Sequence, residues 1–142
     1  MSAYKQLQDI NFTILFLGDN EMLNEKAING LTKASPEKRY KNFLNTVTDL
    51  EEVWLLSSKN GYATVEFDGF IHILLWPQKE FCKCVFSEDE KPCSFEIHEF
   101  LEKCKNLDNS IRFMVFPTEV DSYVVTAEQL YSDIAEHLEE IE

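Results

Sequence analysis

Glycine and proline are scarce in this chain, with four of each among 142 residues. That scarcity excludes collagen-like and low-complexity chains, which are rich in these residues. Because 44% of the residues are hydrophobic and 13% are aromatic, we expect one folded domain of ordinary size. The four glycines are too scattered for a phosphate-binding loop, and the chain contains no serine nucleophile elbow. The sequence therefore offers no catalytic residues.

Basic side chains are also few, since 13 lysines and arginines stand against 26 aspartates and glutamates, for a formal net charge of −13. Residues 87–142 hold four basic and fifteen acidic side chains, a net of −11, whereas residues 22–86 hold eight of each. Such a field repels phosphate backbones and anionic membranes and attracts basic partners. We therefore expect no direct binding to nucleic acid or to membranes. A solvated acidic surface that only maintains solubility is the alternative.

Long hydrophobic runs are missing as well. The candidate leader, Ile10–Leu17, has eight residues and is followed by Gly-Asp-Asn-Glu instead of a cleavage site. We predict that it forms a strand and that the protein is cytoplasmic.

In a reducing compartment, cysteines are expected to be free thiols. Cys82, Cys84 and Cys93 with His98 have the side-chain types that zinc prefers. The gap between Cys82 and Cys84 is short for a zinc site, however, and on a helix the two would point to nearly opposite sides. Cys104 lies on an apolar helical stripe. We expect buried thiols, no metal and no cofactor.

The stretch from Glu52 to Pro77 predicts the centre of a sheet. Strands are expected over Glu52–Leu56, Tyr62–Phe67 and Phe70–Trp76, with turns at Asn60-Gly61 and Asp68-Gly69. If Asp68-Gly69 is the hairpin loop, the residues opposite each other are Phe67 and Phe70, Val65 and His72, and Ala63 and Leu74.

Helices are expected both before and after this stretch of the sequence. One should follow a cap at Ser35, with Tyr40, Phe43, Leu44 and Val47 inward and Lys38, Arg39 and Lys41 outward. Further helices are predicted over Asn24–Thr32 and Gln78–Phe86, along the stripe Ile97, Phe100, Leu101 and Cys104, and after Thr126 with Leu130, Ile134, Leu138 and Ile141 inward.

Later strands are expected over Cys93–Ile97, Ile111–Phe116 and Tyr123–Val125. This order predicts an α+β fold, with one mostly antiparallel sheet of about five or six strands covered by amphipathic helices. We assign residues 1–21 to an N-terminal extension with one strand and residues 22–142 to a single domain.

From Met22 onward, the chain contains a series of short sequence motifs. They are Leu23-Asn24-Glu25-Lys26, Ser35-Pro36-Glu37-Lys38-Arg39-Tyr40, Glu52-Val53-Trp54, Gly61-Tyr62, Trp76-Pro77, Phe100-Leu101, Val115-Phe116-Pro117 and Thr126-Ala127-Glu128-Gln129-Leu130. In these motifs and their order, the chain resembles an uncharacterised family of small bacterial proteins, the domain of unknown function 2750 family. The resemblance implies a compact bacterial cytoplasmic domain and supplies no catalytic residues.

Two functions of different classes remain open. The first is an acidic binding domain that neutralises a basic partner, most concretely an immunity protein against a nuclease-type toxin. The predicted contacts are Glu88, Asp89, Glu90, Glu119 and Asp121.

The second is an undescribed enzyme or small-ligand-binding domain with a pocket near Trp54, His72 and Trp76. A lone histidine on an apolar strand face is more often a hydrogen-bonded core residue than a catalyst. A third possibility is that the strand Ile10–Leu17 completes the sheet of another subunit. The sequence leaves the oligomeric state open.

Overall fold

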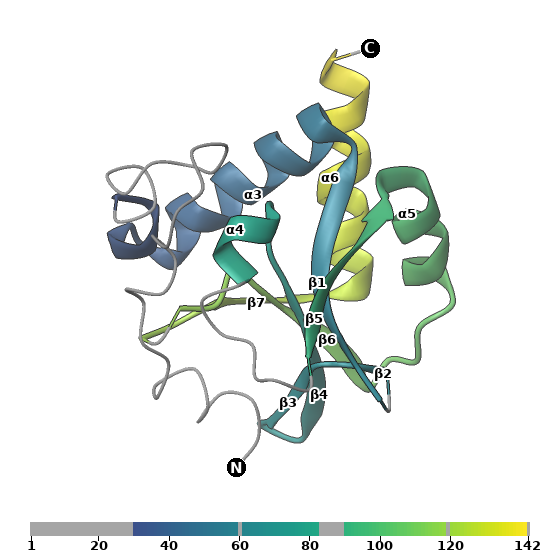
Figure 1. Ribbon diagram of the computed structural model, residues 1–142. Helices are drawn as coiled ribbons and strands as arrows, with labels where there is room; N and C mark the ends of the chain where they lie inside the picture. The colour runs from purple at the N-terminus through teal and green to yellow at the C-terminus, as the bar shows by residue number, and fades with distance from the viewer. Residues whose placement is uncertain (1–29, 60, 83–89, 119, 142) are drawn as a thin grey trace.

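Figure 1 shows the computed structural model, which describes residues 30–59, 61–82, 90–118 and 120–141. The predicted strand in the N-terminal extension and most of the helix expected over Asn24–Thr32 lie outside these ranges. The predicted α+β class is confirmed. The elements are α3 (Pro36–Leu50), β1 (Glu52–Ser58), β2 (Gly61–Tyr62), β3 (Thr64–Phe67), β4 (Phe70–Leu75), α4 (Lys79–Cys82), β5 (Lys91–Glu96), α5 (Ile97–Lys105), β6 (Ile111–Val115), β7 (Tyr123–Thr126) and α6 (Ala127–Ile141).

The described strands form two sheets, so the prediction of one sheet with five or six strands was wrong. The first has the strand order β2-β1-β5 and the second has the order β3-β4-β6-β7, in which β4 and β6 run parallel. The predicted strand Tyr62–Phe67 is divided at Ala63, because β2 pairs with β1 whereas β3 pairs with β4. Reciprocal backbone hydrogen bonds of 3.0 and 2.9 Å between Trp54 and Trp76 connect the two sheets.

The register of the β3–β4 hairpin agrees with the sequence prediction. Phe67 stands opposite Phe70 and Val65 opposite His72, and the Leu74 N–H donates to the Ala63 carbonyl at 3.4 Å. Asp68 and Gly69 have φ angles of 54° and 81°, as a two-residue hairpin loop with left-handed residues requires. The loop chemistry alone was enough to set this register.

Helix α3 begins where the sequence predicts. The Ser35 side chain accepts a hydrogen bond from the Lys38 N–H at 3.2 Å, and Pro36 occupies the first helical position. The four predicted inward residues are all buried. Arg39, however, was predicted to face outward and is 1% exposed.

Arg39 is buried because its guanidinium joins the start of α3 to the turn after β6. Its Nε donates to the Phe116 carbonyl at 3.1 Å, and its Nη1 donates to the Ala34 carbonyl. Its Nη2 donates to the carbonyl of Asp121 at 3.1 Å and also to the carboxylate of that residue. The helical pattern around Arg39 contains no sign of these contacts, since Phe116 and Asp121 lie far away in the sequence.

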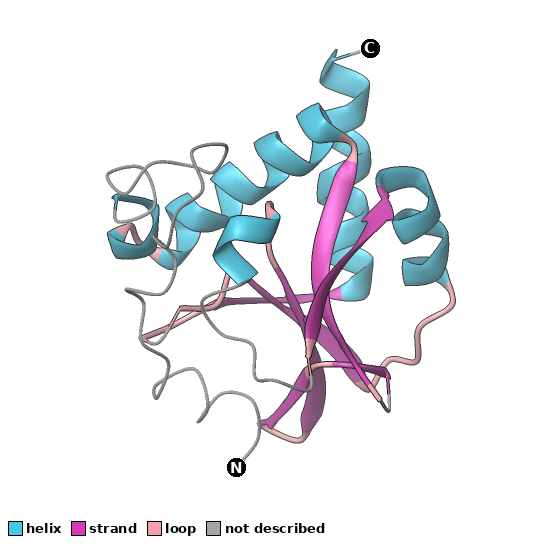
Figure 2. Cartoon of the chain, in the orientation of Figure 1, coloured by secondary structure: helices cyan, strands magenta, loops and turns pink. Residues whose placement is uncertain are grey.

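The apolar faces that helical periodicity predicts are the faces that the helices bury. The predicted residues of α5 and the first three of α6 are buried, whereas the side chain of Ile141 is not described. Thr126 caps α6 by accepting a hydrogen bond from the Gln129 N–H at 3.1 Å. In Figure 1 and Figure 2, α3 and α6 lie above the strands and α5 lies to their right, whereas α4 lies on the left of β1. The core therefore lies between helices and sheets.

Candidate functional site

The two longest described helices, α3 and α6, pack against each other, and residues near their C-terminal ends line one hollow. A hydrogen bond of 2.5 Å from the Tyr40 hydroxyl to the Asp133 carboxylate joins them. Burial and, to a lesser extent, this hydrogen bond raise the pKa of Tyr40. The Tyr40 ring also stacks on Tyr123 of β7, with ring centroids 4.1 Å apart. These contacts join the first halves of the two helices to each other and to the start of β7.

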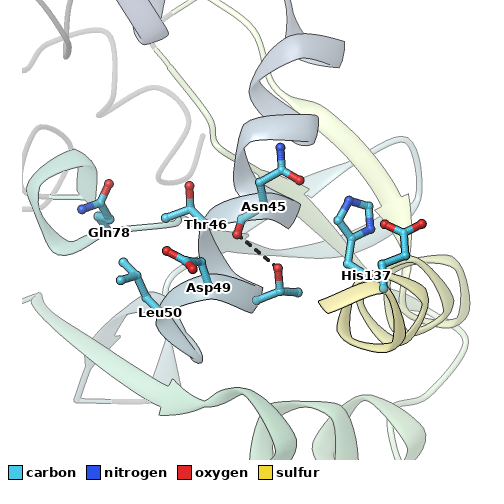
Figure 3. A pocket seen from close by; sticks show the side chains of 8 residues that line it. Asn45, Thr46, Asp49, Leu50, Gln78 and His137 are labelled. Carbon is cyan, nitrogen blue, oxygen red and sulfur yellow. Dashed lines mark hydrogen bonds between the residues drawn. The ribbon is translucent and has the colours of Figure 1, made fainter. Parts of the chain in front are cut away.

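A hollow of about 570 Å³ lies at these helix ends. Figure 3 shows residues of the last turns of α3 at its centre, with Gln78 on one side and His137 of α6 on the other. The lining residues are Asn45, Thr46, Thr48, Asp49, Leu50, Gln78, His137 and Glu140.

The lining of this hollow contains two carboxylates and no lysine or arginine. Asp49 and Glu140 contribute carboxylates, and Asn45 contributes an amide. The Thr48 hydroxyl is engaged, because it lies 2.8 Å from the Leu44 carbonyl and 3.1 Å from the Asn45 carbonyl. The Nδ1 atom of His137 lies 3.1 Å from the Asp133 carbonyl. The hollow therefore suits a group that donates hydrogen bonds and carries positive charge.

Further carboxylates lie on segments next to the end of α3. The Glu51 carbonyl accepts a hydrogen bond of 2.9 Å from the Ile97 N–H, which places the start of α5 beside the end of α3. Glu52 and Glu96 stand opposite each other in the β1–β5 pairing. We use the name acidic end for the carboxylates that these helix and strand ends carry: Asp49, Glu51, Glu52, Glu96, Glu99, Glu139 and Glu140.

The acidic end has few cations of its own. The last turns of α3 and α6 contain no basic residue, although a cation is favoured near a helix C-terminus, where the helix dipole is negative. The ion pairs in the described ranges join Arg39 to Asp121, Lys105 to Glu102 and His98 to Glu96. Asp49, Glu139 and Glu140 take part in none of them. Their charges therefore add to the negative field of the two helix ends.

The predicted partner-binding residues lie elsewhere or outside the described ranges. Glu88, Asp89 and Glu119 are not among the described residues. Glu90 is partly buried just before β5. Asp121 is held by Arg39, although its side chain is 42% exposed. Sequence reasoning missed the acidic end because its members come from three stretches of sequence, residues 49–52, 96–99 and 139–140, that only the fold brings together.

The three residues of the predicted pocket are in or next to the core. His72 is 1% exposed, and its Nδ1 lies 3.3 Å from the Val65 carbonyl. Trp76 is equally buried and donates from its indole to the Pro117 carbonyl at 3.3 Å. Trp54 is partly buried and donates to a Glu52 carboxylate oxygen at 3.2 Å. A ligand would have to displace core side chains to reach the imidazole.

The burial of His72 predicts a loss of stability in mild acid. Burial lowers the pKa of His72 below the ordinary histidine value of 6.5. The unfolded chain then binds a proton at a higher pH than the folded chain does, so stability is full above pH 6.5 and decreases as the pH falls below it. Urea denaturation at pH 7.5 and pH 5.5 measures this decrease.

His72→Gln is the matched variant for that measurement, because it removes the titrating group. We expect the difference in unfolding free energy between the two pH values to be smaller for His72→Gln than for the original protein. An equal difference would show that another group causes the acid sensitivity.

The described ranges contain neither an arranged metal-ligand cluster nor a membrane-spanning helix. No group of three or more histidine, cysteine, aspartate or glutamate side chains there is arranged to hold a metal ion. None of the helices in that part of the chain is long and apolar enough to cross a membrane. Cys93 and Cys104 are free thiols, and burial raises the pKa of Cys104 to about 12.

One family model matches the chain, over residues 40–134, and is described as a protein of unknown function, DUF2750. The matched range begins within α3 and ends within α6, so it includes both sheets and most of the acidic end. The motifs before Tyr40 lie outside it. No match was found among curated proteins or among solved structures. The family match covers more than half of the sequence, and the chain therefore belongs to the DUF2750 family.

Proposed function

We propose that this protein binds a basic protein partner through the acidic end and thereby neutralises it. The most concrete case is an immunity protein that occludes a bacterial toxin acting on nucleic acid. The observation that carries the proposal is that α3 and α6 end side by side without a basic residue in either last turn. Negative helix ends and carboxylates repel one another, which costs stability unless a cation is bound.

The hollow between the helix ends gives this surface a shape as well as a charge. A lysine or arginine of the partner has a long apolar stem and a cationic head. Leu50 is 47% exposed at the hollow and offers apolar contact to such a stem. Asp49 and Glu140 offer acceptors to the head. A toxin that binds nucleic acid carries basic residues in its binding site, so covering them would block its substrate.

Affinity capture followed by measurement on the purified pair tests the proposal. The full-length protein is used as bait in extract of its native host at low salt, and proteins that elute as the salt rises are identified. The dissociation constant of each purified candidate is then measured at 50 mM and 500 mM NaCl. We expect a basic partner whose affinity falls at least about tenfold between the two salt concentrations, because ions screen exposed charges.

Glu140→Lys and Glu66→Lys form a matched pair for this measurement, since both change the charge by the same amount. Glu66 is exposed on β3, outside the acidic end. We expect only Glu140→Lys to weaken binding strongly. A captured protein that binds both variants equally, or whose affinity does not depend on salt, would contradict the proposal.

A further inference from the structure

A hollow of about 130 Å³, separate from the one at the acidic end, lies where α5 meets both sheets. The pairings of the strands place its lining on matching faces. Phe113 stands opposite Ile73 in the second sheet, and Phe95 of the first sheet stands opposite Val53, two residues from Leu55 and therefore on the same face as Leu55. We call this space the aromatic hollow, after the rings among its principal lining residues: Leu55, Tyr62, Ile73, Phe95, Phe100 and Phe113.

The floor of the aromatic hollow is buried and uncharged. Leu55, Phe100 and Phe113 form it, and the ring centroids of the two phenylalanines are 5.7 Å apart. Cys104 lies beside them, and burial keeps its thiol protonated by raising its pKa to about 12. A buried water molecule needs two to four polar partners, whereas the side chains of this floor offer only a weak thiol donor. The floor therefore favours an apolar occupant over water.

The rim of the aromatic hollow reaches solvent. Tyr62 is 42% exposed, and Ile73, Phe95 and Leu107 are only partly buried. The Tyr62 ring meets the Phe95 ring edge-on, with centroids 5.7 Å apart. The Lys103 ammonium group lies 5.1 Å from the centroid of the same Phe95 ring. These contacts hold Phe95 as one wall of the hollow, and a molecule can enter past the rim without displacing the floor.

We propose that the aromatic hollow binds a small molecule with a single aromatic ring, which enters ring first and leaves any polar substituent at the rim. An apolar cavity of about 150 Å³ holds a benzene molecule, so the volume of about 130 Å³ suits one ring. The rings of Phe95, Phe100 and Phe113 can meet the edge or the face of an aromatic ligand, which favours it over an aliphatic ring of the same size. The orientation follows because a polar substituent at the floor would lose its hydration without gaining a partner.

Titration of the full-length, isotope-labelled protein with phenol, followed by NMR, tests the proposal. Cyclohexanol is the comparison probe, because it carries the same hydroxyl group on a ring of similar size that is not aromatic. We expect phenol to shift the amide signals of Leu55, Phe100 and Cys104 and to bind at least about threefold more tightly than cyclohexanol. Equal binding of the two probes, or shifts confined to other parts of the protein, would overturn the proposal.

Two variants separate the volume of the hollow from its aromatic character. Ile73→Phe fills the hollow from its partly buried rim, and we expect it to weaken the binding of both probes by at least about tenfold. Tyr62→Leu keeps the rim apolar but removes one ring, so phenol should bind about threefold more weakly and cyclohexanol should be unaffected.

Phe67→Leu is the matched control, since Phe67 is 56% exposed on β3, outside the hollow. It should leave the binding of both probes unchanged. Normal phenol binding in Ile73→Phe, with a thermal transition showing that the variant is folded, would contradict the proposal. Tyr62 is exposed, so Tyr62→Leu tests the site even if Ile73→Phe does not fold, and an unchanged ratio of phenol to cyclohexanol affinity in that variant would also count against it.

Discussion

Replacing Arg39 with methionine should lower the free energy of unfolding by about 2–4 kcal/mol, because hydrogen bonds from a charged donor contribute roughly 1.5–3 kcal/mol each and several would be lost. Methionine keeps much of the apolar stem but none of the donors. The carbonyls of Ala34 and Phe116 would each lose a hydrogen bond from the guanidinium. Chemical denaturation followed by circular dichroism measures the change.

Lysine should not restore what arginine provides at this position. The guanidinium donates from three nitrogens to groups in three separate places along the chain, and a single ammonium group cannot reproduce that planar geometry. We therefore expect Arg39→Lys to recover less than half of the stability lost in Arg39→Met. The loss should also increase the mobility of the turn that contains Asp121, which hydrogen exchange would detect.

Lys38→Met and Lys41→Met are the controls, because both lysines are exposed on the same helix. We expect each to change stability by no more than about 0.5 kcal/mol. If Arg39→Met were as mild as these two, the network around Arg39 would contribute little to the fold.

The second large effect is expected at the acidic end, where stability and binding should change in opposite directions. The double variant Asp49→Lys, Glu140→Lys should bind the captured basic partner at least about 100-fold more weakly at low salt, since it converts attraction into repulsion. The same variant should be more stable than the original protein by about 1 kcal/mol, because it places cations at two helix C-termini.

This opposite change distinguishes a binding surface from a structural one. If Asp49 and Glu140 supported the fold, their replacement would lower both stability and affinity. Surfaces that serve a partner often carry such a cost in the free protein. Glu66→Lys again serves as the control for charge, and we expect it to change the affinity by less than about threefold. A double variant that is less stable and binds normally would refute the assignment.

Several features of the fold were accessible from local sequence. Ser35 and Pro36 located the start of α3, and Asp68-Gly69 set the register of the β3–β4 hairpin. The inward stripes of α5 and α6 followed from helical periodicity. Each of these features depends on residues within a few positions of one another, so the sequence pattern contains the relevant contacts.

The division into two sheets was not accessible in this way. β1 pairs with β5, which lies more than thirty residues later, and β4 pairs in parallel with β6. Apolar periodicity shows that a strand is buried but not which strand it pairs with. The division of the predicted strand at Ala63 has the same cause, because the residues before and after Ala63 pair with strands of different sheets.

The location of the candidate site likewise depends on residues that are far apart in the sequence. Sequence reasoning placed the acidic surface in the loops around Glu88 and Glu119, where acidic residues are close in sequence. Most of these residues lie outside the described ranges, so that prediction stays untested. The acidic end is a different surface, which combines the ends of α3 and α6 with the β1–β5 pairing. The burial of Arg39 and the aromatic hollow between the sheets were likewise invisible in the sequence.

By itself, the sequence determined the net charge, the α+β class, the β3–β4 turn and the inward faces of the helices, because these follow from composition and from spacing along a few residues. The tertiary structure alone decided which strands pair, which charges meet and where cavities form. These depend on contacts between residues that are far apart in the chain, and many arrangements of the same elements would satisfy the local pattern equally well.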